Sequence, residues 1–241
     1  MGAERQIVAW GGAVSKNPDE NAPMLDYILK QSGKDRPRVC ITGPGAEETA
    51  QGYQYLSAFS RFDCRLSHLS LFRQPMPDFE ELVLGNDVVY VGGGNPRSML
   101  ALWREYELDR ILRLAWERGV VLAGVSAGAI CWFEEILTQA DATGRRNGRA
   151  ALGLLPGSCV PHYNSTPGLS EAYHDAVSQG RVKGGYAIDD GAALHFVGTE
   201  LRRVVTLRDD VTAYRIDADH GSIRKERLEA ELLLADEGLG K

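Results

Sequence analysis

The first two thirds of the chain alternates short apolar runs with segments whose apolar residues recur at helical spacing. The apolar runs predict strands at Gln6–Trp10, Arg38–Thr42, Asp87–Val91 and Val120–Gly124, with the shorter Cys64–Leu66 as a further candidate. The periodic segments predict helices at Ala22–Gln31, Glu47–Ser60, Asp78–Leu84, Pro96–Trp103, Leu108–Arg118 and after Ser126. Strands that alternate with helices indicate parallel βαβ units and therefore a doubly wound, mainly parallel α/β sheet.

The last third follows a different pattern. Short strand-like runs are separated by Asp-Asp-Gly and Arg-Asp-Asp turns, which predicts a short antiparallel extension of the sheet. These runs are Val182–Ile188, Ala192–Val197, Arg202–Leu207 and Val211–Ile216. A helix is expected at Leu228–Ala235, followed by a frayed end, and Ala140–Arg149 is expected to be a mobile loop. No repeat or linker interrupts the chain, so we expect residues 1–241 to form a single domain.

Composition narrows the class of protein. Hydrophobic residues make up 44% and charged residues 25% of the 241, which is ordinary for a soluble globular protein. The net charge of −6 predicts no nucleic-acid partner, and no apolar run reaches the roughly 18 residues of a membrane span. The first residues lack a signal-peptide pattern. The cysteines are Cys40, Cys64, Cys131 and Cys159, with no Cys-x-x-Cys pair; they predict reduced thiols in a cytoplasmic protein without a zinc site.

The segment Gly124-Val125-Ser126-Ala127-Gly128 follows a buried strand and precedes an expected helix. A serine on such a tight strand-to-helix turn exposes its hydroxyl, as a nucleophile requires. The glycines allow another segment to approach closely, and the N–H of Ala127 is free to face a developing oxyanion. We therefore consider Ser126 a candidate nucleophile.

A serine nucleophile needs a base, which is usually held by a carboxylate. His162 follows an apolar segment and Pro161, which fixes the backbone and can aim the imidazole. The other histidines are interpreted as surface or packing residues: His68, His174, His195 and His220. The acid candidates are Asp189 and Asp190, at the end of an expected strand and beside a glycine, although Asp-Asp-Gly is also an ordinary turn sequence.

The loop Gly92-Gly93-Gly94-Asn95-Pro96 has two interpretations. Glycine loops before helices bind phosphate, but this one lacks both the G-x-G-x-x-G pattern and a following Lys-Ser or Lys-Thr. Alternatively, its backbone N–H groups form an oxyanion hole together with that of Ala127.

The chain resembles the peptidase E (aspartyl dipeptidase) family of serine peptidases, to which cyanophycinases are related. The resemblance is carried by the serine and glycine motifs above together with Pro161-His162-Tyr163 and Ala187-Ile188-Asp189-Asp190-Gly191, which occur in the family's order and at close to its spacing. The resemblance runs from about Gln6 to Glu200. It implies a fold like class I glutamine amidotransferases, a short-peptide substrate, no cofactor or metal, and a homodimer. The net charge, which leaves no basic face, predicts no membrane partner. It further implies Ser126 as nucleophile, His162 as base, Asp190 as acid with Asp189 as the fallback, and Gly94 and Ala127 as oxyanion donors.

The chain departs from the family pattern where substrate is bound. Family members specific for an N-terminal aspartate carry an arginine after the catalytic histidine, whereas here Glu171 falls near that position and the first arginine is Arg181. We therefore expect a neutral or basic N-terminal residue in the substrate rather than strict Asp-X specificity. Asn95, Tyr163 and Glu171 are the candidate substrate contacts.

Two alternatives remain open at the sequence level. An α/β-hydrolase-type esterase would pair Ser126 with Asp189 or Asp190 and with His220, in the order serine, acid, histidine. An amidotransferase-like binding module without activity would also share the fold, because fold does not fix function.

Overall fold

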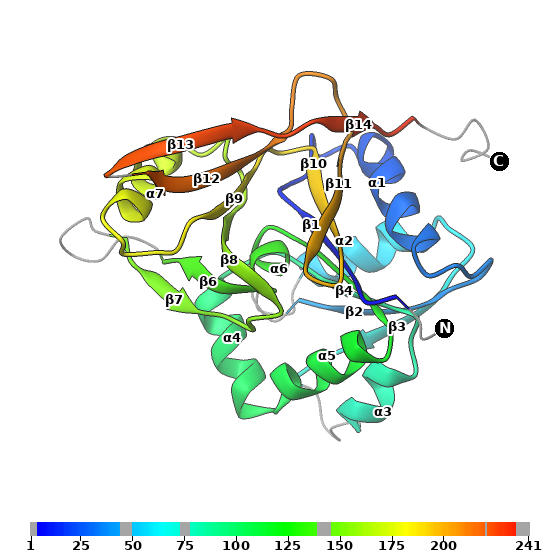
Figure 1. Cartoon of the computed structure of the whole chain (residues 1–241). Coiled ribbons are helices and arrows are strands. Elements are labelled where there is room, and N and C mark those ends of the chain that lie inside the picture. The colour runs from blue at the N-terminus through cyan, green and yellow to red at the C-terminus, as the bar shows by residue number, and fades with distance from the viewer. Residues whose placement is uncertain (1–3, 44–49, 73–77, 139–145, 220, 235–241) are drawn as a thin grey trace.

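The computed structural model describes residues 4–43, 50–72, 78–138, 146–219 and 221–234. Within these residues the strands form two sheets, which lie at an angle to each other in Figure 1. The first has the order β14-β11-β10-β1-β5-β4-β2-β3. Its strands are β1 (Gln6–Trp10), β2 (Arg38–Thr42), β3 (Arg65–Leu69), β4 (Val88–Val91), β5 (Val121–Val125), β10 (Ala192–Val197), β11 (Glu200–Thr206) and β14 (Ala230–Leu232).

The centre of the first sheet is parallel. The strands β1, β5, β4, β2 and β3 run in the same direction, and β10 and β11 extend the β1 edge in antiparallel fashion. The central strands β4 and β5 are apolar throughout because both faces of the sheet are covered. In β1, Ile7 and Ala9 pack on one face, and Val8 and Trp10 pack on the other. The predicted doubly wound α/β sheet is thus confirmed.

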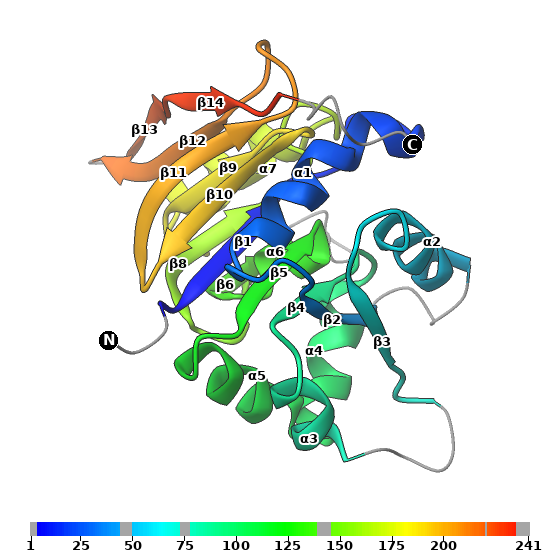
Figure 2. The same cartoon turned by 90° about the vertical axis from the view of Figure 1, so that its right-hand side faces the viewer.

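Helices cover the two faces separately. α1 (Pro18–Lys30) and α2 (Ala50–Phe59) lie on the face of Val8 and Trp10, and α3 (Phe79–Leu84), α4 (Pro96–Glu105) and α5 (Leu108–Glu117) lie on the face of Ile7 (Figure 2). The helices α1, α3 and α4 begin with ordinary side-chain caps. Asn95 caps α4 by accepting hydrogen bonds from the N–H groups of Arg97 (3.0 Å) and Ser98 (3.3 Å), and a proline follows it.

A second sheet, not predicted from the sequence, has the order β13-β12-β9-β8-β6-β7. Its strands are β6 (Phe133–Leu137), β7 (Gly148–Ala150), β8 (Leu155–Val160), β9 (Gly185–Ile188), β12 (Ala213–Asp219) and β13 (Ser222–Arg227). The helix α7 (Leu169–Ser178) packs on it through a separate apolar cluster that includes Tyr173, Val177 and Ile216. The second sheet places the carboxyl ends of β8 and β9 beside each other, because Val160 pairs with Ala187 in parallel register.

The expected helix at Leu228–Ala235 is wrong for the residues that the structure describes. This segment passes through β14, which pairs in parallel with β11, and the N–H of Leu233 donates to the carbonyl of Thr206 (2.7 Å). Leu, Glu and Ala favour a helix intrinsically, but pairing with a sheet edge satisfies the same backbone groups and outweighs that weak preference.

Two further expectations need correction. The helix after Ser126 is a single turn, α6 (Ala127–Ile130), because Trp132 and Phe133 are buried in the core and the chain enters β6 at once. Of the expected mobile loop at Ala140–Arg149, residues 148 and 149 belong to β7, and residues 140–145 lie outside the described part of the chain. The expected frayed end lies outside it as well.

Candidate active site

Ser126 sits between β5 and α6 in a conformation that few non-glycine residues adopt, with φ +58° and ψ −113°. Its N–H donates to the carbonyl of Trp10 at 3.0 Å. The flanking glycines are sterically required. A Cβ atom on Gly124 would lie 2.4 Å from the carbonyl oxygen of Gly128, and one on Gly128 would lie 2.1 Å from that of Val91. The strand-to-helix turn is therefore as tight as the sequence predicts.

His162 reaches Ser126 from the second sheet. It follows β8 with φ +54°, and the next residue anchors the loop to β9 through a hydrogen bond from Tyr163 N–H to the carbonyl of Ile188 (3.1 Å). The imidazole Nε2 lies 2.8 Å from Ser126 Oγ, and Nδ1 lies 2.6 Å from Asp190 Oδ1. The structure thus brings the three expected residues into one hydrogen-bonded line in the order Ser126, His162 and Asp190.

The two adjacent aspartates face different surroundings. Asp189 is buried, and its carboxylate accepts a hydrogen bond from the N–H of Thr212 at 3.1 Å, which ties β9 to the segment before β12. Asp190 is half-buried, and its second oxygen accepts a hydrogen bond from Ser165 Oγ at 2.5 Å. The N–H of Asp190 donates to Asn164 Oδ1 at 2.9 Å. Only Asp190 contacts His162, so the fallback assignment to Asp189 has no support in the geometry.

The electrostatics of this line favour one proton arrangement. Burial acts to raise the pKa of Asp190, but hydrogen bonds from His162 and Ser165 outweigh it and hold the pKa below its ordinary value. A carboxylate can only accept, so its partner Nδ1 carries the hydrogen. The neutral imidazole then presents an unprotonated Nε2 to the hydroxyl of Ser126. Asp189 behaves in the opposite way, because burial raises its pKa.

Gly12 is a site residue that sequence reasoning missed. A Cβ atom at this position would lie 1.9 Å from Asp190 Oδ1 and 2.7 Å from His162 Nδ1. The N–H of Gly191 donates to the carbonyl of Gly12 at 2.7 Å, which holds the β1 loop against the Asp-Asp-Gly turn. The only sequence signal was a Gly-Gly pair at a strand end. Ser165 and Asn164, which hold Asp190, carried no distinguishing signal.

A cavity of about 280 Å³ opens at Ser126 and His162. Gly94 and Ala127, the expected oxyanion donors, line it, so the glycine loop after β4 and the start of α6 meet at the nucleophile. Apolar side chains form much of the remaining wall, among them Ile130, Leu137 and Leu169. Arg146 also lines this cavity, and it hydrogen-bonds the carbonyl of Thr138 through Nη1 at 3.3 Å.

None of the three expected substrate contacts lines this cavity, although Asn95 stands between Gly94 and Pro96, which do. Asn95 is exposed and caps α4. Tyr163 and Glu171 line a neighbouring cavity of about 560 Å³, which Ser126 does not line, together with Arg208 and Lys225. The hydroxyl of Tyr163 contacts His174 Nε2 at 2.9 Å. The preference for a neutral or basic N-terminal residue, which was inferred from Glu171, therefore remains a prediction, and Glu171 does not line the cavity at Ser126.

The other histidines and the cysteines do not belong to the hydrogen-bonded line of Ser126, His162 and Asp190. His195 is buried between Tyr27 and Gln6, His174 lies on α7, His68 lies on β3, and His220 is outside the described residues. The four cysteines are unpaired. Among the described residues, no group of three or more His, Cys, Asp or Glu side chains is placed to hold a metal ion, and no helix is long and apolar enough to span a bilayer.

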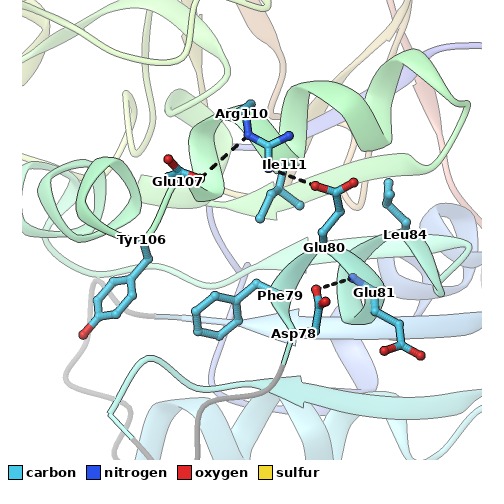
Figure 3. A pocket seen from close by; sticks show the side chains of 9 residues that line it. All are labelled: Asp78, Phe79, Glu80, Glu81, Leu84, Tyr106, Glu107, Arg110 and Ile111. Carbon is cyan, nitrogen blue, oxygen red and sulfur yellow. Dashed lines mark hydrogen bonds and ion pairs between the residues drawn. The ribbon is translucent and has the colours of Figure 1, made fainter.

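The hollow between α3 and α5 is a surface feature away from Ser126 (Figure 3). Its wall carries several carboxylates and Arg110, which pairs with Glu80 at 2.9 Å. Its lining includes none of Ser126, His162 and Asp190.

A serine, a histidine and an aspartate in one hydrogen-bonded line, at the carboxyl edge of a parallel α/β sheet, are typical of serine hydrolases. The chain belongs to peptidase family S51, a family of serine-type peptidases, whose model matches residues 7–204. It is 46% identical over 214 residues to the uncharacterized peptidase YgaJ of Bacillus subtilis (strain 168), covering 88% of this chain and 92% of that protein. The resemblance to the peptidase E family is confirmed.

Solved structures agree in fold. A peptidase from an acI-B1 Actinobacterium superposes with a TM-score of 0.69 at 17% identity, covering 95% of this chain and 96% of its own. A protein from Listeria monocytogenes EGD-e that is assigned as peptidase E gives a TM-score of 0.63 at 17% identity, covering 94% and 100%. At this identity the likeness establishes the fold alone.

Proposed function

We propose that this serine peptidase hydrolyses dipeptides or other short peptides through Ser126, His162 and Asp190. The observation that supports the proposal is the continuous hydrogen-bonded line from Asp190 Oδ1 through the imidazole to Ser126 Oγ, with separations of 2.6 and 2.8 Å. These separations are within hydrogen-bond reach for nucleophile activation. Here Ser126 is the nucleophile, its turn is a nucleophile elbow, and no cofactor takes part.

The reaction follows from the proton arrangement. Ser126 Oγ attacks the scissile carbonyl carbon, and its proton passes to His162 Nε2. The negative charge on the carbonyl oxygen faces the N–H groups of Gly94 and Ala127. His162 then gives the proton to the leaving nitrogen as the carbon–nitrogen bond breaks. Water, activated by the same imidazole, hydrolyses the acyl-enzyme and restores Ser126. Asp190 stays ionised and stabilises the imidazolium in both half-reactions.

Arg146 supports the restriction to short peptides. The leaving amine must lie beside His162, so the residue on the carboxyl side of the scissile bond occupies the cavity that Arg146 lines. A guanidinium there suits the free terminal carboxylate of a dipeptide. It also disfavours a basic side chain in this cavity.

The first experiment compares wild-type protein with Ser126→Ala on a dipeptide panel that varies the N-terminal residue. We expect hydrolysis by the wild type and a loss of kcat of roughly 10⁴-fold or more in the variant, with an unchanged melting temperature. Equal hydrolysis by both proteins would reject Ser126 as nucleophile, and no hydrolysis by either would favour a binding module. Retained labelling of a His220→Ala variant by a serine-reactive phosphonate would reject the esterase alternative.

Arg146→Gln tests the dipeptide restriction. We expect kcat/KM to fall about tenfold or more for a dipeptide with a free carboxyl end and to change little for the same dipeptide as its C-terminal amide. Arg149→Gln is the matched control, because Arg149 is exposed on β7 and does not line this cavity. An equal loss on both substrates would contradict the assignment.

The wider proposal includes a single domain, a homodimer and a cytoplasmic location, as the family resemblance and the composition imply. Light scattering on the purified protein would test the dimer, since a mass of one chain, 26.4 kDa, would contradict it.

A further inference from the structure

The carboxylate of Asp190 can rotate unless both of its oxygens are held. The torsion that turns an aspartate carboxylate about its Cβ–Cγ bond has broad minima rather than narrow staggered ones. One hydrogen bond, from His162 Nδ1–H to Oδ1 at 2.6 Å, therefore leaves the plane of the carboxylate free to tilt. A tilt turns the imidazole with it and changes the direction in which Nε2 faces Ser126 Oγ. A fixed geometry needs a second point of attachment.

Ser165 supplies this second attachment. Its hydroxyl donates to Asp190 Oδ2 at 2.5 Å, a length typical of a charge-assisted hydrogen bond between a hydroxyl and a carboxylate. The oxygen that does not face the imidazole is thus held as well. The same contact favours the ionised carboxylate, because burial raises the pKa of Asp190 whereas the hydrogen bonds from His162 and Ser165 lower it.

The two donors belong to one turn of the chain. The carbonyl of His162 accepts the N–H groups of Ser165 (3.2 Å) and Thr166 (3.0 Å), so the chain folds back directly after the base. This turn fixes the spacing between the imidazole and the Ser165 hydroxyl. Within the turn, Asn164 Oδ1 accepts the backbone N–H of Asp190 at 2.9 Å. The segment that carries the base therefore also holds the acid, at its carboxylate and at its backbone.

Water could occupy the place of the Ser165 hydroxyl, because this residue is exposed. A water molecule would satisfy Oδ2 but would not fix its position, since water is not tied to the turn after His162. The carboxylate is otherwise enclosed, with 23% of the Asp190 side chain exposed and the backbone of Gly12 so close that a Cβ atom there would lie 1.9 Å from Oδ1. The contribution of the hydroxyl is therefore one of position.

We propose that Ser165 is a positioning residue for the hydrolysis, because through Asp190 it holds the imidazole of His162 in the orientation that accepts the proton of the nucleophile. Ser165 is not a substrate contact, since its neighbour Thr166 lines the cavity at Ser126 and Ser165 does not. The assignment rests on the proposed function, because it takes Asp190 as the acid. Loss of the hydroxyl should lower turnover without weakening substrate binding.

The experiment compares Ser165→Ala, which removes the hydroxyl, with Ser165→Thr, which keeps it. The position is exposed and does not hold a positive φ angle, so we expect both variants to keep the melting temperature of the wild type. On a dipeptide that the wild type cleaves, Ser165→Ala should lower kcat about tenfold at an unchanged KM, and Ser165→Thr should recover most of this loss. Ser178→Ala is the matched control, since it removes a hydroxyl that only bonds the carbonyl of Asp175 within α7, at 3.1 Å.

Proton NMR gives a readout that a merely structural role would not move. The proton between His162 Nδ1 and Asp190 resonates far downfield and is identified by the loss of its signal in Asp190→Asn. We expect this signal to shift and broaden in Ser165→Ala, because the carboxylate that holds the proton becomes mobile, and to return in Ser165→Thr. The measurement needs no substrate.

The inference is wrong if kcat or the downfield signal is unchanged in Ser165→Ala, if KM alone rises, or if Ser165→Thr shares the loss. If the wild type cleaves no peptide, the proposed function fails, and the rate at which a serine-reactive phosphonate labels Ser126 takes the place of kcat. Labelling of Ser165→Ala that is about tenfold slower than that of the wild type then supports the positioning role without hydrolysis. Equal labelling of the two proteins, or labelling of neither, overturns it.

Discussion

At the scale of single residues, Asp189 and Asp190 show how adjacent identical side chains acquire different chemistry. Successive residues at a strand end point in different directions, so one carboxylate meets the backbone of Thr212 and the other meets His162. The residue pattern alone offers no means to choose between them, since both belong to one turn motif, and only the family resemblance favoured Asp190. The choice depends on where the segment before β12 and the loop after β8 lie, and both are long-range features.

This contrast predicts different phenotypes for two neighbouring substitutions. Asp190→Asn should lower kcat by about 10³- to 10⁴-fold with little change in stability, because the imidazole loses the acceptor that fixes its tautomer. Asp189→Ala should leave kcat within a few-fold but cost about 1–3 kcal/mol of unfolding free energy, since it leaves the N–H of Thr212 unpaired. Steady-state kinetics and urea denaturation measure both effects. The reverse pattern would show that Asp189 is the acid.

Arg146 and Gly12 mark the limit of residue-level prediction. Ser126, His162 and Asp190 were identifiable because each sits at the end of an apolar run, and strand ends of a parallel sheet meet at one edge. Arg146 belongs to a polar segment with no periodicity, and its approach to Ser126 depends on β6 and β7. Gly12 matters only through the two side chains that a Cβ atom would displace.

At the scale of elements, local pattern was sufficient for the central sheet and insufficient for the second one. Buried parallel strands such as β1 and β2 are continuous apolar runs, and their bounds agree with prediction. β6 and β13 carry charged residues at several positions, and β14 is exposed throughout, so their sequences resemble loops or helices. Such strands form because partner strands satisfy their backbone hydrogen-bonding groups. The sequence of one segment does not show which distant strand it will pair with.

The packing of α6 against β4 gives a prediction at this scale. Gly128→Ala places a Cβ atom 2.1 Å from the carbonyl oxygen of Val91, so α6 must move away from the strand. We expect a loss of about 1–3 kcal/mol in unfolding free energy, together with lower activity, because Ser126 and Ala127 move with the helix. Gly43→Ala is the control, since the nearest atom to its Cβ among the described residues, Gly92 Cα, is 4.0 Å away. Equal stability of the two variants would contradict the close approach.

At the scale of the whole molecule, His195 couples stability to pH. It lies 3% exposed on β10, where Tyr27 of α1 and Gln6 of β1 contact its two ring nitrogens at 2.6 and 3.0 Å. Burial and the nearby Arg203 and Arg202 lower its pKa from 6.5 to about 4. The unfolded chain therefore binds a proton more readily than the folded chain between these values. The folded state loses stability as pH falls through this window.

The expected size of this effect is on the order of 3 kcal/mol between pH 7 and pH 4, from about 1.4 kcal/mol per pKa unit. Urea denaturation across this range measures it, with His195→Gln as the comparison. The variant should be less stable than wild type at pH 7 and should lose less stability on acidification, because glutamine does not titrate. Parallel pH profiles of unfolding free energy for the two proteins would show that His195 does not cause the loss of stability at acid pH.

The backbone of the proposed catalytic pair has a consequence for how this chain can evolve. Ser126 and His162 both hold positive φ angles, a conformation that favours glycine over any residue with a side chain. Glycine at either position would relieve local strain and remove the chemistry. Selection for a more durable fold and selection for turnover therefore act in opposite directions at these two positions. A lineage released from the need to cleave peptides would be expected to lose these side chains early, while the sheet around them persisted.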